Sequence, residues 1–270
     1  MWRRLANPAP FWFMRDGLPA VGARLGKRHG RQDRTLQLTR RNALALLADP
    51  AGLRAAWRAR LARADLDRGH VSQAAALFND VGLTAQGPVR WGARVTSDNA
   101  GVYVVELDRT FETAPIDRGI VAGWLARFPA MTLDGHTPSV DDLVGRLSAF
   151  WLPSQTIVYI GCTTVPLSHR VAAYYKTPLG DRSPHRGGYW VKTLSVLDRC
   201  WVTWAIDEED PEKAEGRLLN AFPPAVPDAE ALALHDRSRV LPFANLRDAR
   251  RVAKNHGLRG ATETRGRGRA

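Results

Sequence analysis

The chain has 270 residues, of which 44% are apolar and nine are tryptophan, so it can bury the core of a globular domain. It has no apolar run near the roughly 18 residues that cross a bilayer, no clear signal peptide, and too few cysteines for a disulfide framework, which favours a cytoplasmic protein without a membrane partner. Lys and Arg total 39 against 27 Asp and Glu, and this net charge of +12 predicts a polyanionic partner such as nucleic acid.

The positive charge is concentrated at both ends of the chain. Residues 1–41 hold ten Lys or Arg against two acids, and residues 246–270 hold eight against two. Either end could follow a phosphate backbone. The alternative is that the arginine excess reflects only a coding bias.

Residues 1–95 are expected to form a basic, mainly helical N-terminal region. A loop-rich stretch over 1–34 precedes three helical patterns, one that begins after Thr39 and two at about 52–66 and 71–81. Short helices with basic faces could bind DNA, or they could form a helical cap for packing or dimerisation.

A linker rich in turn residues, Gly82 to Asn99, leads into an apolar, β-branched strand at 101–107. The segment 106–156 then has the pattern of a helical insertion. Its apolar residues recur at helical spacing over 117–128 and 139–151.

From residue 156 onwards, strands and helices alternate. The expected elements are a strand at 156–162, a helix at 166–176, a loop at 177–188, an apolar stretch at 189–197, a strand at 200–206 and a helix at 211–222. Residues 255–270, which end in TRGRGRA, are expected to be a disordered basic tail. We therefore predict an α/β domain over 96–254, built on a small, mainly antiparallel three-stranded sheet flanked by helices.

Six residues on these elements could together hydrolyse a phosphodiester. They are Tyr103, Tyr159, Arg170, Tyr174, Glu215 and Asn245. The reaction needs a base, charge stabilisation, a cation at the leaving oxygen and positioning. A single carboxylate can hold one Mg²⁺, an arginine offers a planar fork to phosphate oxygens, and residues four apart on a helix share a face. Each residue also has a structural interpretation, as a core tyrosine, a solvated charge or a turn cap.

The order of these six residues resembles the catalytic signature of the GIY-YIG nucleases. Gly101-Val102-Tyr103 resembles the first motif with valine for isoleucine, and Tyr159-Ile160-Gly161 matches the second. In that family a tyrosine is the general base, a glutamate binds the one metal and an arginine stabilises the transition state. The resemblance covers a little under half of the chain.

The resemblance implies a role for each of the six residues. Tyr103 or Tyr174 would be the base, and Arg170 would stabilise the transition state. Glu215 would be the protein ligand of one Mg²⁺, and Tyr159 and Asn245 would complete the site. Arg170 follows Tyr159 by 11 residues, close to the usual spacing.

The chain departs from the family pattern in three places. About 55 residues separate the two motifs, which resembles the branch of restriction endonucleases that carry inserts there. Cys162 follows the second motif, where lysine is common. The gap from Glu215 to Asn245 is long and contains a Pro-rich loop.

Three further residues are candidate substrate contacts. His185 and Arg186 lie in a glycine-containing loop that could meet a phosphate, and Lys176 ends the arginine helix. A structural turn is the alternative for that loop. The residues Cys162, His169, His185 and Cys200 lack the paired cysteine spacing of a zinc site.

The sequence therefore predicts a Mg²⁺-dependent DNA endonuclease, most simply of restriction type. The alternatives are a repair or modification-dependent nuclease, and a nucleic-acid-binding protein that kept the fold and lost catalysis. A homodimer is expected for a double-strand cut, because a fold with one site cuts one strand. We also expect residues 1–95 or the 106–156 insertion to contact bases.

Overall fold

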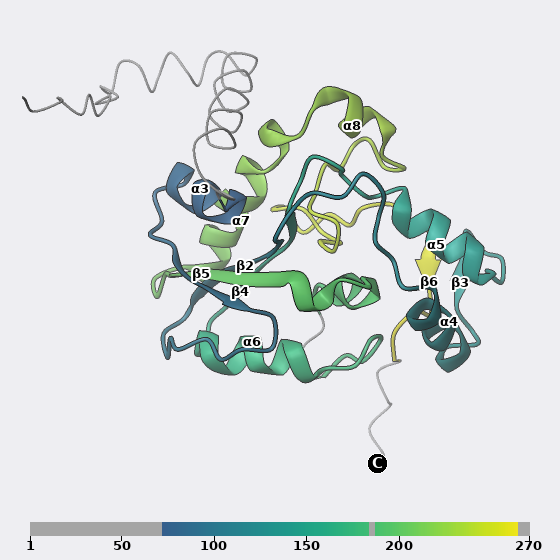
Figure 1. Ribbon diagram of the computed structural model, residues 1–270, viewed down its shortest axis with the longest axis horizontal. Coiled ribbons are helices and arrows are strands. Elements are labelled where there is room, and N and C mark those ends of the chain that lie inside the picture. Colours follow the sequence, from purple (N-terminus) through teal and green to yellow (C-terminus); the bar gives the residue numbers. More distant parts are fainter. Residues whose placement is uncertain (1–71, 184–186, 264–270) are drawn as a thin grey trace, which may run out of the picture.

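A computed structural model describes residues 72–183 and 187–263 of the chain. Its centre is a four-stranded, fully antiparallel sheet in the order β1-β5-β2-β4 (Figure 1). The strands are β1 (Gln86–Arg90), β2 (Gly101–Leu107), β4 (Ile157–Thr163) and β5 (Cys200–Ile206). The predicted α/β class and antiparallel pairing are confirmed, whereas the predicted count of three strands is wrong.

The fourth strand, β1, lies in the segment for which we predicted a linker. Its sequence QGPVR contains Gly87 and Pro88, which interrupt any alternation of apolar residues. Proline is tolerated in a strand at an edge or a bulge, because it has no backbone N–H to donate. The structure places β1 at the edge beside β5, where the Trp204 ring packs against Gly87 and its Nε1 donates to Gln86 Oε1 at 3.0 Å.

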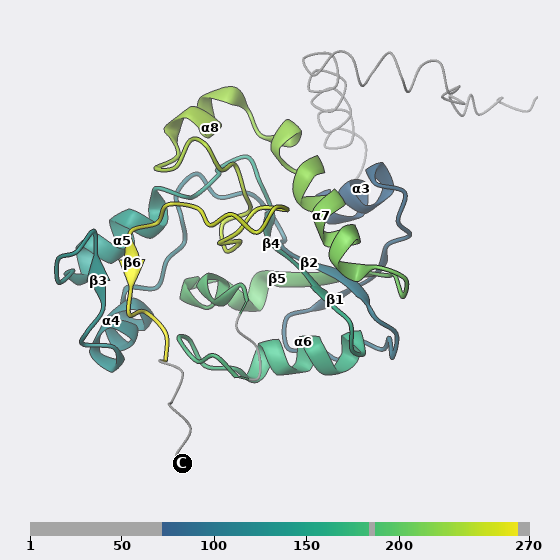
Figure 2. The same ribbon diagram turned by 180° about the vertical axis from the view of Figure 1, so that it is seen from behind.

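Helices cover both faces of this sheet. Helices α3 (Gln73–Asp80) and α7 (Pro211–Ala221) lie on one face, and α6 (Leu167–Lys176) lies on the other (Figures 1 and 2). Side chains alternate along β2, so Val102 and Val104 pack under α3 and α7, while Tyr103 and Val105 point to the α6 side. The strands and helices predicted near residues 101, 156, 166, 200 and 211 are confirmed.

The N-terminal boundary of the fold falls earlier than residue 95. Glu106, buried on β2, accepts hydrogen bonds from Ser72 Oγ and from the Ala74 backbone N–H, and so holds the start of α3. Leu77 and Phe78 of α3 belong to the core beneath α7. Residues 72–95 are thus part of the sheet domain. The helices predicted after Thr39 and over 52–66 lie outside the described residues.

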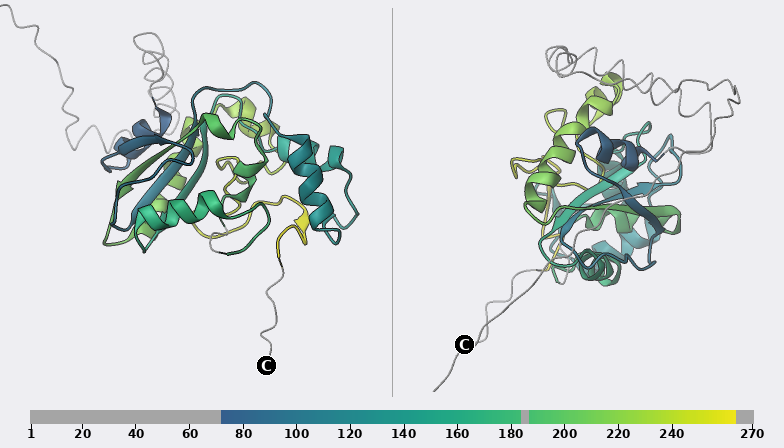
Figure 3. Two further views of the ribbon diagram at one scale, coloured as in Figure 1. Left: turned by 60° about the horizontal axis from the view of Figure 1, so that its bottom comes forward. Right: turned by 90° about the vertical axis from the view of Figure 1, so that its left-hand side faces the viewer.

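The insertion between β2 and β4 forms α4 (Arg118–Arg127), β3 (Thr132–Leu133) and α5 (Val140–Ser148). Both helices begin at predicted positions, with Asp117 and Ser139 as side-chain N-caps. They stand apart from α6 and α7, at the far end of the molecule (Figure 3).

The C-terminal segment is ordered further than we predicted. Strand β6 (Leu258–Arg259) pairs antiparallel with β3, and Leu258 and Ala261 are buried. The prediction of disorder is therefore wrong for 255–263. The composition concealed this strand, because two residues between Gly257 and Gly260 give no periodicity. Residues 264–270 lie outside the described part.

Shorter elements complete the chain between α6 and β6. They are the 3-10 helices η1 (Tyr189–Thr193), η2 (Leu197–Arg199) and η3 (Pro223–Ala225), and helix α8 (Asp228–Ala233). Within residues 72–183 and 187–263, no helix is both long and apolar enough to cross a membrane.

Candidate active site

The strand register brings three tyrosine rings together. Tyr103 of β2 faces Gly161 across the β2–β4 pair, and Tyr159 faces Val105, so both phenols stand on the α6 side of the sheet. Tyr174 reaches them from α6. Ring centroids are 6.0 Å apart for Tyr103 and Tyr159, 5.4 Å for Tyr159 and Tyr174, and 6.3 Å for Tyr103 and Tyr174. The predicted phenols therefore form one buried cluster.

Two glycines leave the space that these rings occupy. A Cβ on Gly161 would lie 2.9 Å from the Tyr103 hydroxyl and 2.9 Å from the Tyr159 ring. A Cβ on Gly188 would lie 2.5 Å from the Tyr174 hydroxyl, and Gly188 has a φ of +62°. The glycine of Tyr-Ile-Gly is thus required by the packing of the two motif tyrosines.

The three phenols differ in their partners. Burial raises the pKa of Tyr103, Tyr159 and Tyr174 above the ordinary value of a phenol. The Arg170 guanidinium opposes that rise most at Tyr103, which also shares a side-chain hydrogen bond with Tyr159. Tyr174 Oη instead donates to the Gly188 carbonyl at 2.5 Å.

Arg170 lies close to this cluster and has a hydrogen-bond donor without an acceptor. Its Nε is buried and finds no hydrogen-bond acceptor among the described residues. A buried guanidinium donor without a partner is unusual, since such groups are costly to desolvate. The charge and the free donor fit an anion.

Glu215 lies on α7, on the face of the sheet opposite the three tyrosines. Its carboxylate is 9% exposed and accepts a hydrogen bond from Cys162 Sγ at 3.3 Å. Burial raises the pKa of Glu215, and the nearby Arg251 opposes that rise. Burial, together with the Glu215 carboxylate, also raises the pKa of Cys162, to about 12, so this thiol stays protonated as a donor.

Arg251 is a member of the site that the motif does not contain. Its Nη1 lies 3.2 Å from Glu215 Oε2, and its Nη2 lies 3.3 Å from Glu212 Oε2, one turn earlier on α7. Arg251 adopts the left-handed backbone region with a φ of 62°. Asp248 fixes this turn, because its Oδ1 accepts from the Arg250 and Val252 backbone N–H groups.

Asn245 acts on the backbone of the second motif. Its Oδ1 accepts from the Ile160 N–H at 2.9 Å, and its Nδ2 donates to the Ile160 carbonyl at 2.8 Å. Because β4 is an edge strand, these two bonds satisfy groups that no neighbouring strand reaches. Asn245 therefore positions the strand that carries Tyr159 and Gly161.

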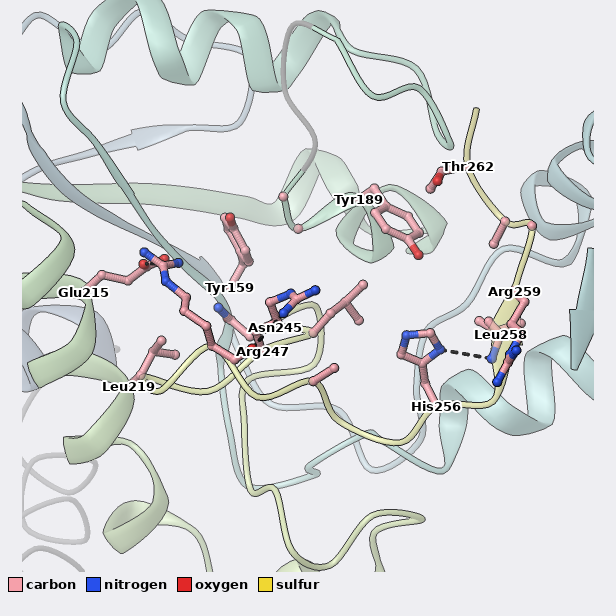
Figure 4. Close-up of a pocket in the computed structure, with 17 residues that line it drawn as sticks. Tyr159, Tyr189, Glu215, Leu219, Asn245, Arg247, His256, Leu258, Arg259 and Thr262 are labelled. Carbon is pink, nitrogen blue, oxygen red and sulfur yellow. Dashed lines mark hydrogen bonds and ion pairs between the residues drawn. The ribbon is translucent and has the colours of Figure 1, made fainter. Parts of the chain in front are cut away.

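A cleft of about 450 Å³ opens beside these groups (Figure 4). Tyr159 and Glu215 lie at one end of it, and Arg259 and Thr262 lie at the other. The residues of its long wall come from one stretch of chain, Asn245 to Thr262. Its charged and imidazole groups are Glu215, Arg247, Arg251, His256 and Arg259.

The donor set limits which metal this site could hold. The described residues contain no cluster of three or more His, Cys, Asp or Glu side chains fit for a metal ion. Both contacts of the Glu215 carboxylate fall on Oε2, and the group borders the cleft. One carboxylate in an open cleft fits Mg²⁺, which keeps most of its waters and binds substrate phosphate directly. It does not fit a closed zinc site.

The remaining predicted contacts are less central. Lys176 is exposed in the last turn of α6. His185 and Arg186 lie outside the described residues, directly before Gly187, which lines the cleft. Sequence reasoning missed the cleft arginines Arg247, Arg251 and Arg259. The excess of positive charge over 246–270 was the signal that pointed to them.

A scan against models of known families, a search of curated proteins and a search of solved structures each find no match. The functional proposal therefore rests on the geometry described above.

Proposed function

We propose that the protein is a Mg²⁺-dependent DNA endonuclease of the GIY-YIG type. The observation that carries the proposal is the convergence of Tyr159 and Glu215 on one cationic cleft, with Tyr103 and Arg170 directly behind. Together these residues would supply a base, a carboxylate for the metal and a cation for the phosphate, which are the groups that phosphodiester hydrolysis requires.

Of the two tyrosines considered for the base, the contacts favour Tyr103. The Tyr174 hydroxyl already donates to Gly188, whereas Arg170 favours the ionised form of Tyr103. Tyr103 is fully buried, so it acts through Tyr159, which lines the cleft. The Tyr103 phenolate takes the Tyr159 proton while Tyr159 takes a proton from the attacking water.

Charge on the phosphate is met by two groups. Arg170 does not line the cleft, so it would supply positive charge from behind Tyr159 rather than a direct hydrogen bond to the phosphate. Glu215 would hold one Mg²⁺, which when bound supplies positive charge to the phosphate and leaving oxygen. For that, Arg251 has to share or release Glu215 Oε2.

Replacing Glu215 with glutamine tests this function, with Glu212→Gln as the matched control. Both carboxylates lie on α7 and both contact Arg251, but only Glu215 borders the cleft. We expect Glu215→Gln to lower the rate of plasmid nicking in Mg²⁺ by about 10²–10³-fold, the loss that follows removal of a charge-stabilising group. Glu212→Gln should retain most of the rate.

A catalytically silent DNA-binding protein is the second candidate. Cys162 stands where lysine is common, and Arg251 occupies an oxygen of the metal-binding carboxylate. Wild-type protein that binds DNA and never nicks it with Mg²⁺, over several DNA forms, would establish this alternative. The insertion of α4 and α5 favours the restriction-type role among the nucleases, with repair or modification-dependent cleavage as alternatives.

A further inference from the structure

The cleft that contains Glu215 is lined by more positive than negative side chains. Arg247, Arg251 and Arg259 are exposed along its wall, and Glu215 is the one acid among its described lining residues. Of these arginines, Arg251 alone contacts that carboxylate. The side chains of Arg247 and Arg259 make no ion pair among the described residues, so positive charge is left over for an anionic ligand.

The reactive groups lie deep in this cleft. Tyr159 is 7% exposed and Glu215 is 9% exposed, so a phosphate must enter the cleft to meet them. Its volume of about 450 Å³ is in the lower part of the range of small-molecule sites, about 300–1,000 Å³. That space admits a nucleotide or two and is too small for a double helix.

Apolar and aromatic surface alternates with the arginines. Tyr189, Leu246 and Leu258 line the cleft together with His256. Burial lowers the pKa of His256 to about 4, so its ring is neutral near pH 7 and adds no charge. Proteins that bind single strands without sequence preference combine cations for phosphates with flat or apolar surfaces for bases.

The insertion between β2 and β4 holds the cleft wall in place before any ligand binds. Strand β3 pairs with β6, and Trp124 Nε1 of α4 donates to the Ala261 carbonyl at 2.8 Å. Arg146 of α5 donates to the His256 carbonyl at 3.0 Å. These contacts fix the segment from His256 to Ala261 from its outer side and leave its inner side facing the cleft.

We infer that the cleft between Glu215 and Arg259 binds one unpaired strand of nucleic acid, with Arg247, Arg251 and Arg259 on its phosphates. The substrate of this site is therefore a single strand or a single-stranded part of a duplex, and a plasmid would have to open locally before it is nicked. This inference rests on the proposed function for the chemistry at Glu215, but strand binding itself needs no cleavage. The insertion serves as the scaffold of the strand-binding wall.

Binding in the absence of Mg²⁺ tests the inference. A labelled single-stranded oligonucleotide, the same sequence as a blunt duplex, and the duplex with a single-stranded tail are titrated at several salt concentrations. We expect the single strand and the tailed duplex to bind more tightly than the blunt duplex. The logarithm of the binding constant falls linearly as the logarithm of the salt concentration rises. Arg247→Ala, Arg251→Gly and Arg259→Ala should each make this negative slope shallower by about 0.7 for the single strand.

The chain offers matched controls. Arg250→Ala removes an exposed arginine next to Arg251 that does not line the cleft, and the slope should stay unchanged. Glycine is chosen at Arg251 because the φ of 62° suits it, so the turn is retained. Arg251→Lys should restore the slope, because lysine also contacts phosphate as a point charge.

The outcomes separate the two proposals. Equal binding of single strand and blunt duplex, or slopes unchanged in all three variants, would overturn the single-strand cleft even where Mg²⁺ supports nicking. Selective single-strand binding with slopes lowered as expected supports it, even where the wild-type protein cuts no DNA and the nuclease proposal fails.

Discussion

At the scale of single residues, the main feature of the site is that one phenol lines the cleft and a second lies behind it in the core. Tyr159 borders the cleft, and Tyr103 lies beneath it with no exposed surface. Because burial raises the pKa of both, few molecules carry a phenolate near pH 7. The positive charge of Arg170 partly offsets the rise in the pKa of Tyr103, so Tyr103 ionises more readily than Tyr159 or Tyr174.

The pH dependence of cleavage follows from this arrangement. A base must be deprotonated to act, and its raised pKa lies above the assay range, so the single-turnover rate should rise about tenfold per pH unit from neutral pH upwards. Tyr103→Phe should lower the rate and flatten this rise. Tyr175→Phe is the control, because burial also raises the pKa of Tyr175 on α6, yet its ring packs against Trp91 and lies outside the cluster of three phenols. A Tyr103→Phe enzyme with the wild-type profile would exclude Tyr103 as the base.

At the scale of elements, the free edge of β4 is closed by a side chain. Asn245 binds both the N–H and the carbonyl of Ile160, and all of these groups are buried. The pair replaces a ladder that β4 lacks on that side. It joins the segment 241–246 to the second motif.

Asn245→Ala should therefore destabilise the fold. It leaves a buried donor and a buried acceptor of Ile160 without partners, and each such group costs about 1–3 kcal/mol. We expect the free energy of unfolding, measured by urea titration, to fall by about 2–4 kcal/mol. Asn255→Ala, at an exposed asparagine ten residues further along the chain, should change it little. A similar small change at Asn245 would mean that water replaces both bonds.

The elements that sequence could predict are those with strong local patterns. Strands β2, β4 and β5 are apolar and β-branched, and helices α6 and α7 carry a clear apolar face. Strand β1 was hidden by Gly87 and Pro88, since its place at the sheet edge depends on pairing with a partner more than a hundred residues away. Strand β6 was hidden in the same way, because only the insertion gives it a partner.

The candidate site was predictable to the same degree. The tyrosines and Glu215 were found through their place in regular elements. Arg251 was not, because it stands in a turn and its proximity to α7 is a product of the whole fold. A sequence shows which residues share a strand or a helix face, but it does not show which loop closes over them.

At the scale of the molecule, one buried lysine joins three distant segments. Lys254 Nζ donates to the Phe243 carbonyl at 2.7 Å and lies 4.6 Å from the Phe150 ring and 4.4 Å from the Trp190 ring. These partners belong to the end of the insertion, to η1 and to the segment that carries Asn245. The lysine thus connects the strand-binding wall to the core beneath the tyrosines.

Burial lowers the pKa of Lys254 well below its ordinary value, and Asp236 opposes the shift only in part. The unfolded chain therefore binds a proton that the folded chain lacks, so stability should rise with pH between the lowered pKa and about 10.4. Urea titrations between about pH 6 and pH 10 should show this rise in the wild type, and Lys254→Met should remove the part due to this residue.

Lys192, whose pKa burial lowers to about 8, adds its own rise in stability above that pH in both proteins. Lys213→Met, at an exposed lysine of α7, should leave the wild-type profile intact. If the Lys254→Met and wild-type profiles run parallel, the lysine is charged in the fold, and the rings of Phe150 and Trp190 stabilise a cation rather than a neutral amine.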